Sequence, residues 1–452
     1  MNLVTELKNL FIDLKSFKWS LFVSLCLLAL VPAIYQTLST AIVSSTVSTE
    51  GIDILGQMEW FDLIDETIRA FLIVPLYSVL NKIYKNSKEK FPNSVFKFGL
   101  TVFAIYALFS LIVFFYGRHL ISLMNPKEAD VEAINSYLML ETLSFVIGII
   151  PTFINVVFIT VGKSKNVYIF MGIKVLVAII GDFALVPFLE VNGIAVANII
   201  SNAVLLIVGI VVLYLEKLIH VSGFKKDDRK DLGSIGLRGL FSGTQQFIDN
   251  IVYVLMVARM VNMVLEQGNY WVANNFIWGW LLIPVTSLSE VIKSDCKDDY
   301  SSLKQKNYYL IATFSVIAWA ITIPLWSLFF RYVQRLENYN EIFLITIKLI
   351  PFYIAYLLCV IPDSIFVGKG ATYLNAINSV FVNFLYYGVW FGCYIGETIK
   401  FTMDTIIMMF GFGMVFHLAL SGLEQYLWVK HKRKRQVIEF AQKVTVKSSA
   451  KV

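Results

Sequence analysis

Charged side chains are scarce in this chain of 452 residues. Aspartate, glutamate, lysine and arginine together make up 15% of it, against about 25% in a typical soluble domain. Hydrophobic residues make up 57%. This composition indicates a membrane protein.

Long polar intervals are absent as well, so the chain has no room for a soluble nucleotide-binding or catalytic domain, which takes at least about 50 residues. We therefore expect no enzyme activity and no bound cofactor. Any pumping must draw on an ion gradient or on the gradient of the substrate itself.

Cysteine and histidine are few and scattered. The cysteines have neither metal-ligand nor disulfide spacing, so we interpret them as small packing residues and predict no metal site. The dispersed histidines and short loops disfavour a membrane-embedded transferase. The residues concerned are Cys26, Cys296, Cys359, Cys393, His119, His220, His417 and His431.

Apolar stretches long enough to cross a bilayer, which takes about 20 residues in a helix, recur along the whole chain. Twelve spans are predicted, at residues 19–46, 56–80, 94–117, 136–161, 166–187, 193–215, 237–264, 270–292, 306–330, 342–367, 371–395 and 402–429.

Lysine and arginine are concentrated in alternate loops, at residues 82–90, 163–165, 225–230 and 293–306, and in the tail. The positive-inside rule then places both termini in the cytoplasm of a multi-pass protein of the cell (inner or plasma) membrane. An even number of spans agrees with that orientation. The basic tail HKRKRQ, from His431 to Gln436, either anchors this topology or binds anionic lipid headgroups.

The chain also repeats itself. FLIVPLYS, which starts at Phe71, aligns with WLLIPVTS, which starts at Trp280, and FITVGKSK, from Phe158, aligns with SIFVGKGA, from Ser364. We predict an all-α membrane protein of twelve transmembrane helices in two six-helix bundles, related by a pseudo-two-fold axis along the membrane normal, with a binding cavity between them. The predicted units are a lobe at 1–216, a cytoplasmic linker at 217–236, a second lobe at 237–430 and a tail at 431–452.

Three segments resemble the multidrug and toxic compound extrusion (MATE) family: LMNPKEADVEAINSYLML after the third span, the turn VGKSKN after the fourth, and VNGIAVANIIS at the start of the sixth. The resemblance implies a V-shaped pair of six-helix bundles that exports organic cations or other amphipathic compounds in exchange for Na⁺ or H⁺. The same superfamily includes flippases for lipid-linked oligosaccharides, which the motifs separate only weakly.

The resemblance also implies a cation site at Asp182, because many family members carry an acid at this place in the fifth span. They add an acid in the first span and an asparagine one turn before the fifth-span acid, where this chain has Thr40 and Ala178. A lone carboxylate more readily carries a proton than Na⁺, which needs several oxygen ligands. Lys174 either forms an ion pair with Asp182 or reaches the interface.

The second span carries a group of charged residues. Asp62, Asp65, Glu66 and Arg69 are spaced i, i+3, i+4, i+7 and so share one helical face. A charge at the bilayer centre costs about 2.5–3.5 kcal/mol on insertion scales. The face therefore either forms a polar wall of the substrate cavity or is neutralised by pairing of Arg69 with Asp65 or Glu66.

The repeat aligns further polar residues between the halves. Asn274 and Asn275 occupy the places of Asp65 and Glu66, so the second lobe keeps polarity there without charge. We therefore expect ion coupling, if present, in the first lobe.

The seventh span carries Gln245 and Asp249 at the places of Gln36 and Thr40, next to Gln246 and Asn250. We expect this group to have a transport role or to clamp helices together. Trp278 either stacks on a cationic substrate or anchors the protein at the interface.

Two functions thus follow from the sequence. The first is secondary-active export of small amphipathic or cationic compounds by alternating access, with H⁺ or Na⁺ as the coupling ion. The alternative is flipping of a lipid-linked oligosaccharide or other lipid-linked precursor, for which Arg69, Lys174 and Arg259 would supply positive charge. The expected partners are a small-molecule substrate and membrane lipids but no nucleic acid, and the expected state is a monomer.

Overall fold

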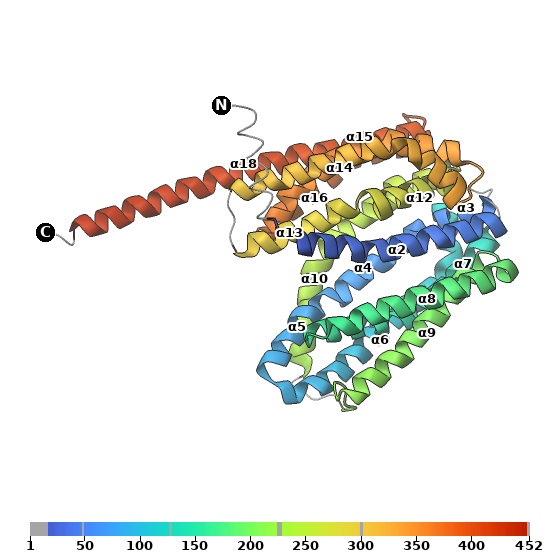
Figure 1. The fold of residues 1–452 in the computed structure, drawn as a ribbon, viewed down its shortest axis with the longest axis horizontal. Coiled ribbons are helices and arrows are strands. Elements are labelled where there is room, and N and C mark those ends of the chain that lie inside the picture. Colours follow the sequence, from blue (N-terminus) through green and yellow to red (C-terminus); the bar gives the residue numbers. More distant parts are fainter. Residues whose placement is uncertain (1–16, 48, 126–128, 224–227, 299–301, 450–452) are drawn as a thin grey trace.

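The computed structural model describes residues 17–449 except 48, 126–128, 224–227 and 299–301, and it is helical throughout, with no strand in the described part (Figure 1). The first half, here the amino bundle, contains α2 (Trp19–Thr46), α3 (Thr49–Gln57), α4 (Glu59–Leu72), α5 (Val74–Asn86), α6 (Phe91–Met124), α7 (Val131–Thr160), α8 (Ser164–Leu189) and α9 (Asn192–Leu215).

The second half, here the carboxy bundle, contains α10 (Asp228–Tyr253), α11 (Arg259–Met263), α12 (Gln267–Phe276), α13 (Ile283–Asp298), α14 (Ser302–Leu328), α15 (Tyr339–Gly368), α16 (Thr372–Phe381), α17 (Gly388–Ile395) and α18 (Met403–Ser449). Four π-helical segments interrupt it, namely η2 (Val254–Ala258), η3 (Ile277–Leu281), η4 (Phe329–Val333) and η5 (Val382–Tyr387).

The second predicted span differs from its expected bounds, because it consists of α3, α4 and α5 rather than one helix over 56–80. Pro75 lies in the first turn of α5, and its repeat partner Pro284 lies in the first turn of α13. Proline suits the first turn of a helix but breaks an interior one, since it lacks the N–H group. The bend between η3 and α13 is 50°.

Among the described residues, eight helices are long and apolar enough to cross a membrane, and the bent pair of α12–η3 with α13 makes a ninth. The three predicted spans that fail this test are those built from α3–α5, α10–α11 and α16–α17. These segments carry polar residues such as Asp65, Asp249 and Asn383. In the second predicted span the helices are also short, with 9, 14 and 13 residues in α3, α4 and α5.

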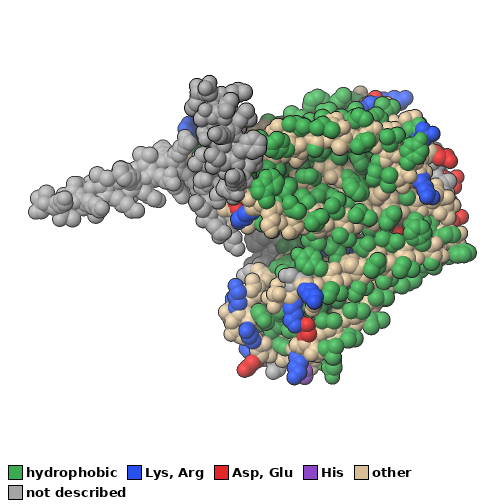
Figure 2. Space-filling view, viewed as in Figure 1, with side chains coloured by type: hydrophobic (Ala, Val, Ile, Leu, Met, Phe, Trp, Pro, Cys, Tyr) green, Lys and Arg blue, Asp and Glu red, His purple; other side chains and the backbone are tan. Residues whose placement is uncertain are grey.

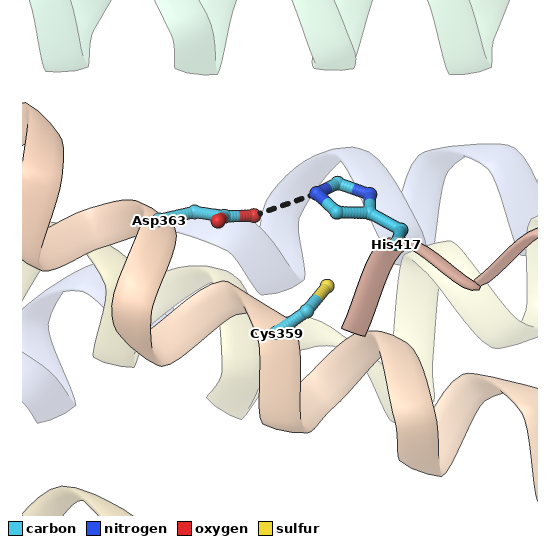
Figure 3. A group of neighbouring side chains, drawn as sticks. All are labelled: Cys359, Asp363 and His417. Atoms are coloured by element: carbon cyan, nitrogen blue, oxygen red, sulfur yellow. Dashed lines mark ion pairs between the residues drawn. The ribbon is translucent and has the colours of Figure 1, made fainter. Parts of the chain in front are cut away.

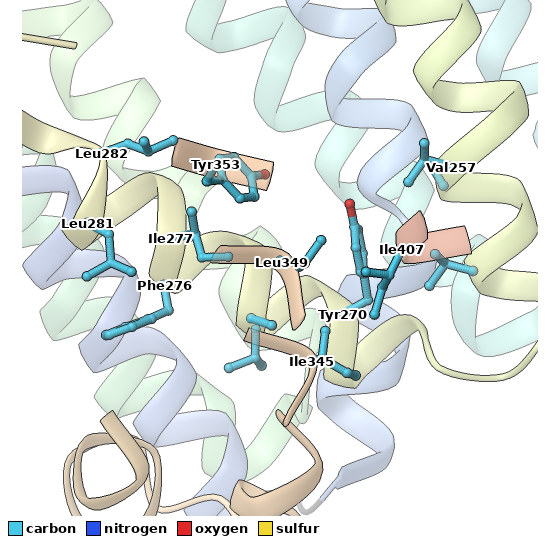
Figure 4. Packing of buried hydrophobic residues seen from close by; sticks show 14 of the residues in the cluster. Val257, Tyr270, Phe276, Ile277, Leu281, Leu282, Ile345, Leu349, Tyr353 and Ile407 are labelled. Atoms are coloured by element: carbon cyan, nitrogen blue, oxygen red, sulfur yellow. The ribbon is translucent and has the colours of Figure 1, made fainter. Parts of the chain in front are cut away.

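The first helix of each half also packs against the other half. Helix α2 packs against α8 of its own bundle and against α13 and η3 of the carboxy bundle, while α10 packs against α4 and α5 of the amino bundle. Because α2 and α10 are repeat partners, the exchange fits a two-fold relation between the halves. The remaining core of the carboxy bundle is formed by closely packed aromatic and aliphatic side chains, including Tyr270, Phe276, Leu349 and Tyr353 (Figure 4).

The outer surface is apolar. Phe115 and Phe188, for example, expose 75% and 83% of their surface, and lysine, arginine and acidic residues gather near the ends of the helices in the view of Figure 2. A helix bundle that exposes large apolar side chains along its length is suited to contact lipid tails.

The two bundles also pack closely where α3 meets α12. A Cβ atom on Gly56 would overlap the backbone of Gln267, and one on Gly268 would overlap Asp53. Nearby, Asn262 donates its side-chain N–H to Asn125 Oδ1 at 2.8 Å. We call this side of the molecule the closed side.

Candidate functional site

A cavity of about 550 Å³ lies between the bundles. Helix α4 contributes to its wall from the amino bundle, and α10, α12, α15, α16 and α18 contribute from the carboxy bundle. Its charged lining residues are Glu59, Glu66, Asp249 and Asp363, with His417 beside them. No lysine or arginine is among the described residues that line it.

One wall of the cavity is a chain of hydrogen bonds between the bundles. Glu59 of α4 accepts a bond from Asn274 at 3.2 Å and from the hydroxyl of Tyr253 at 3.4 Å. Tyr353 donates to Asn274 Oδ1 at 2.8 Å, and Trp278 Nε1 donates to the Tyr353 hydroxyl at 3.1 Å. Glu59 thus joins α4 of the amino bundle to Asn274 of the carboxy bundle.

A second carboxylate, Asp249 of α10, faces α16 and η5. It accepts hydrogen bonds from the Ser379 hydroxyl and from Asn383 Nδ2, the latter at 2.9 Å. Its neighbour Asn250 points to the amino bundle, where it donates to Leu63 O and Thr67 Oγ1, both at 3.0 Å. Asn250 thus joins helices of the two bundles, as one expectation for this group had it, and Asp249 lines the cavity.

The third acid, Asp363 of α15, forms an ion pair with His417 of α18 (Figure 3), with Oδ2 and Nε2 3.1 Å apart. Cys359 points its sulfur toward the same pair. The histidines are dispersed in the sequence, and the spacing of the cysteines predicts packing residues. The fold instead gathers one of each beside an aspartate, because α15 and α18 pack against each other.

Five residues predicted to form the substrate cavity do line it: Glu66, Asp249, Asn274, Asn275 and Trp278. Gln36 lies on α2 opposite Gly279, away from this lining. The side chain of Gln245 lies outside the described residues.

The charged residues of α4 face two different parts of the molecule, the cavity and the interior of the amino bundle. Glu66 faces the cavity, where Asn250 approaches it at 3.4 Å. Asp65 and Arg69 instead turn into the amino bundle. They form an ion pair with Nε 2.6 Å from Oδ2. Residues one apart on a helix differ by about 100°, so adjacent Asp65 and Glu66 separate toward different neighbours.

The amino bundle satisfies the Asp65–Arg69 pair completely. The Tyr106 hydroxyl donates to Asp65 Oδ1, and Arg69 donates to Thr152 Oγ1 at 3.0 Å. The guanidinium group also lies 5.4 Å from the centre of the Phe145 ring. Asp62 remains on the amino-bundle side, near Asp65 and Glu141. Asp62, Asp65 and Arg69 are therefore not part of the cavity wall between the bundles.

Asp182 of α8 is fully buried. The α2 side chains beside it are Tyr35 and Ser39, but neither carboxylate oxygen has a well-aligned hydrogen bond within the described residues. Thr40, at the family's acid position, donates its hydroxyl to Gln36 O of its own helix at 2.9 Å.

The suggested ion pair between Lys174 and Asp182 is not formed. The two residues lie eight positions apart on α8, which separates them by about 12 Å along the helix axis. The acids nearest to Lys174 are instead Glu141 and Asp65.

A further acid that the sequence patterns do not single out is Glu141, which lies buried on α7. It accepts a hydrogen bond from Asn198 Nδ2 at 3.4 Å, and the Tyr35 hydroxyl donates to Asn198 Oδ1 at 3.4 Å. A polar path therefore runs from the surroundings of Asp182 through Tyr35 and Asn198 to Glu141. The available signal was an acid within the fourth predicted span, ten residues before Pro151.

Residues 82–184 match the family model MatE. The fold matches that of an inward-facing multidrug resistance MATE family transporter of the MOP superfamily, with a TM-score of 0.71, 14% identity and coverage of 88% of this chain and 95% of that one. The chain has the MATE fold. The resemblance inferred from the sequence is confirmed, and with it the all-α membrane fold of two six-helix bundles.

Other solved MATE folds match as well. An outward-facing multidrug resistance MATE family transporter gives a TM-score of 0.65 with 14% identity over 93% of this chain and 98% of that one. A MOP superfamily transporter from Pyrococcus furiosus, described as having a binding pocket of reverse polarity, gives a TM-score of 0.63 with 15% identity over 93% of this chain and 97% of that one. None of the curated proteins matches the chain.

The matched MatE segment runs from the end of α5 to two residues after Asp182, so it includes Tyr106, Glu141 and Lys174. The solved proteins with this fold are described as transporters, in line with the expectation that the chain is not an enzyme. The comparisons and the apolar helices together make the chain a multi-pass membrane protein.

Proposed function

We propose that the chain is a secondary-active exporter of small amphipathic or cationic organic compounds, which it exchanges for H⁺ or Na⁺ by alternating access. The observation that carries this proposal is the cavity between the bundles, whose described wall has four carboxylates and no lysine or arginine. Its volume of about 550 Å³ falls in the range of small-molecule sites, roughly 300–1,000 Å³.

The cavity offers both kinds of contact that an amphipathic cation needs. Asp249 and Glu66 supply negative charge, and Trp278, Tyr356 and Phe410 supply aromatic surface. A cation over an aromatic face gains roughly 0.5–1 kcal/mol at an exposed site and more when desolvated. Charge and aromatic surface together favour organic cations over sugars or anions.

Coupling is assigned to the amino bundle. A buried carboxylate without a well-aligned hydrogen bond is costly as an anion, and Asp182 is such a group within the described part of the chain, so we assign the bound proton or cation to it. The neighbouring hydroxyls of Tyr35 and Ser39 are fewer oxygens than Na⁺ normally collects, which supports H⁺ as the ion. Glu141 and Asn198 would extend the proton's path.

The alternative, a flippase for a lipid-linked precursor, requires positive charge in the cavity. Arg69 is neutralised by Asp65, and Arg259 donates to Leu123 O at 3.0 Å and lies over the Tyr394 ring. Lys174 does not line the cavity and interacts with Glu141 and Asp65. The three candidate cations are thus engaged elsewhere, which favours export of a cation over flipping of an anionic lipid.

The test is reconstitution of the full chain into liposomes with an acidic or Na⁺-loaded lumen. A fluorescent organic cation should accumulate when a gradient is imposed, and Asp182→Asn should abolish that accumulation. Glu89→Gln, which changes an exposed acid, is the matched control and should behave as wild type. Movement of a lipid-linked sugar without any gradient, together with no cation uptake, would overturn the proposal in favour of the flippase.

A further inference from the structure

The cluster of Cys359, Asp363 and His417 in the cavity wall contains three different kinds of metal ligand (Figure 3). Cys359 and Asp363 are four residues apart on α15 and therefore share one face of that helix, and His417 faces them from α18. A thiolate, a carboxylate and an imidazole are the ligands that Zn²⁺ takes in proteins.

The spacing of the ligand atoms is close to that of a metal centre. The three atoms lie within 4.8 Å of one another, and Asp363 Oδ2 and His417 Nε2 are 3.1 Å apart. Zn²⁺ bond lengths of about 2.0–2.3 Å place tetrahedral ligands about 3.4–3.6 Å from each other. The Cys359 thiol donates a hydrogen bond to Tyr356 O at 3.1 Å, so completing a three-ligand centre requires the thiol to lose its proton and its side chain to rotate toward Asp363 and His417.

Buried side chains behind the cluster hold the carboxylate in place. Ser421 donates its hydroxyl to Asp363 Oδ1 at 2.8 Å, and Asn378 donates to Ser421 Oγ at 2.8 Å. Ser421 and Asn378 are 0% and 1% exposed. Such outer partners orient the ligands of metal sites and typically contribute 10- to 100-fold to affinity.

The fourth coordination position is accessible. Asp363 and His417 both line the cavity, whereas Cys359 is buried behind them. An ion can therefore reach the ligands from the cavity and keep a water molecule or another ligand on its open side. Thiolate and imidazole select soft or borderline transition metals over Na⁺, Mg²⁺ and Ca²⁺, which prefer oxygen ligands.

We propose that Cys359, Asp363 and His417 form a binding site for a divalent transition-metal ion of the Zn²⁺ type, open to the cavity between the bundles. The site goes beyond the proposed export function and does not depend on it, because binding requires no gradient and no organic substrate. The expectation of no metal site rested on linear spacing, and 54 residues separate Asp363 from His417 in sequence.

The probe is Co²⁺ titrated into the purified, reduced full chain in detergent. Bound thiolate gives a sulfur-to-cobalt charge-transfer band in the near ultraviolet, which wild type should show and Zn²⁺ should abolish by displacement. Cys359→Ser should remove the band, and Cys26→Ser, which changes another free thiol, should leave it intact. Ser421→Ala should keep the band but weaken Co²⁺ binding about tenfold.

Absence of the band in folded wild-type protein would overturn the proposal, leaving Asp363 and His417 as an ion pair that joins α15 to α18. A band that persists in Cys359→Ser would overturn it equally. Cation uptake measured in parallel in metal-free liposomes keeps the two proposals apart, since either can fail while the other holds.

Discussion

In the amino bundle the acids Asp65 and Asp182 are buried away from the cavity, although Glu59 and Glu66 of α4 reach it, whereas in the carboxy bundle both Asp249 and Asp363 line it. The two bundles arise from one repeat, so their folds match while their charges do not. Asp65 is neutralised by Arg69, and Asp182 has no well-aligned hydrogen bond in the described structure. We propose on this basis a division of labour, in which Asp182 of the amino bundle couples ion movement and the substrate binds in the cavity, between the carboxy bundle and α4.

The largest effect is expected from breaking the buried ion pair of the amino bundle. Arg69→Leu leaves Asp65 buried without its cation, which should lower the free energy of unfolding by about 3 kcal/mol. Thermal unfolding in detergent measures the change. Asp65→Asn added to Arg69→Leu should recover part of it.

The control for this prediction is Arg118→Leu, which breaks a pair with Glu132 whose side chains are 67% and 72% exposed. An exposed pair contributes less than about 1 kcal/mol. Equal losses for Arg69→Leu and Arg118→Leu would show that the Asp65–Arg69 pair is not protected from water.

The next effect concerns the closed side, where the two bundles must separate during transport by alternating access. Gly56→Ala places a methyl group against the backbone of Gln267, and overpacking of this kind costs roughly 1–3 kcal/mol. We expect the bundles to move apart where α3 meets α12. Spin labels at the exposed positions 50 and 341 should then report a longer distance.

Gly172→Ala is the control for the closed side, since a Cβ atom there meets nothing within 4 Å. The labels should report an unchanged distance in that variant. If Gly56→Ala behaves in the same way, the contact between α3 and α12 does not hold the bundles together.

A smaller effect is expected from the cavity acid Asp249. Asp249→Asn keeps the size of the side chain but removes its charge, and should weaken binding of a monovalent organic cation about tenfold, or about 1.4 kcal/mol. Titration followed by tryptophan fluorescence measures the affinity. Glu290→Gln, an exposed acid of the same bundle, should change it by less than twofold.

The smallest effect is expected from Trp278, which is 42% exposed at the cavity. Trp278→Leu removes a cation–π contact worth roughly 0.5–1 kcal/mol, so affinity for the cation should fall about two- to fivefold. A neutral substrate analogue of the same shape should be affected less. Equal losses for both ligands would mean that Trp278 contributes only apolar surface.

The helices and their pairing could be predicted because they depend on local signals. Apolar runs locate most spans, and Pro75 and Pro284 mark the same break in both halves. The break between α3 and α4 and the four π-helical segments escaped prediction, because no proline lies within them to mark them in the sequence.

The site was predictable only in part, for a geometric reason. Helical periodicity tells which residues share a face but not which neighbour that face meets. Asp65 and Glu66 were therefore grouped, although they face different bundles. Glu141, Asp363 and His417 acquire their partners only when helices distant in sequence pack together.

The most direct test of the division of labour compares Asp182→Asn with Asp249→Asn in the same preparation. Substrate affinity is measured in detergent, and gradient-driven uptake is measured in liposomes at saturating substrate. We predict that Asp182→Asn keeps the affinity within about twofold but abolishes the response to the gradient, whereas Asp249→Asn weakens affinity about tenfold and keeps that response. The account would be contradicted if each variant lost both substrate affinity and the response to the gradient. It would also be contradicted if Asp182→Asn weakened affinity while Asp249→Asn abolished the response.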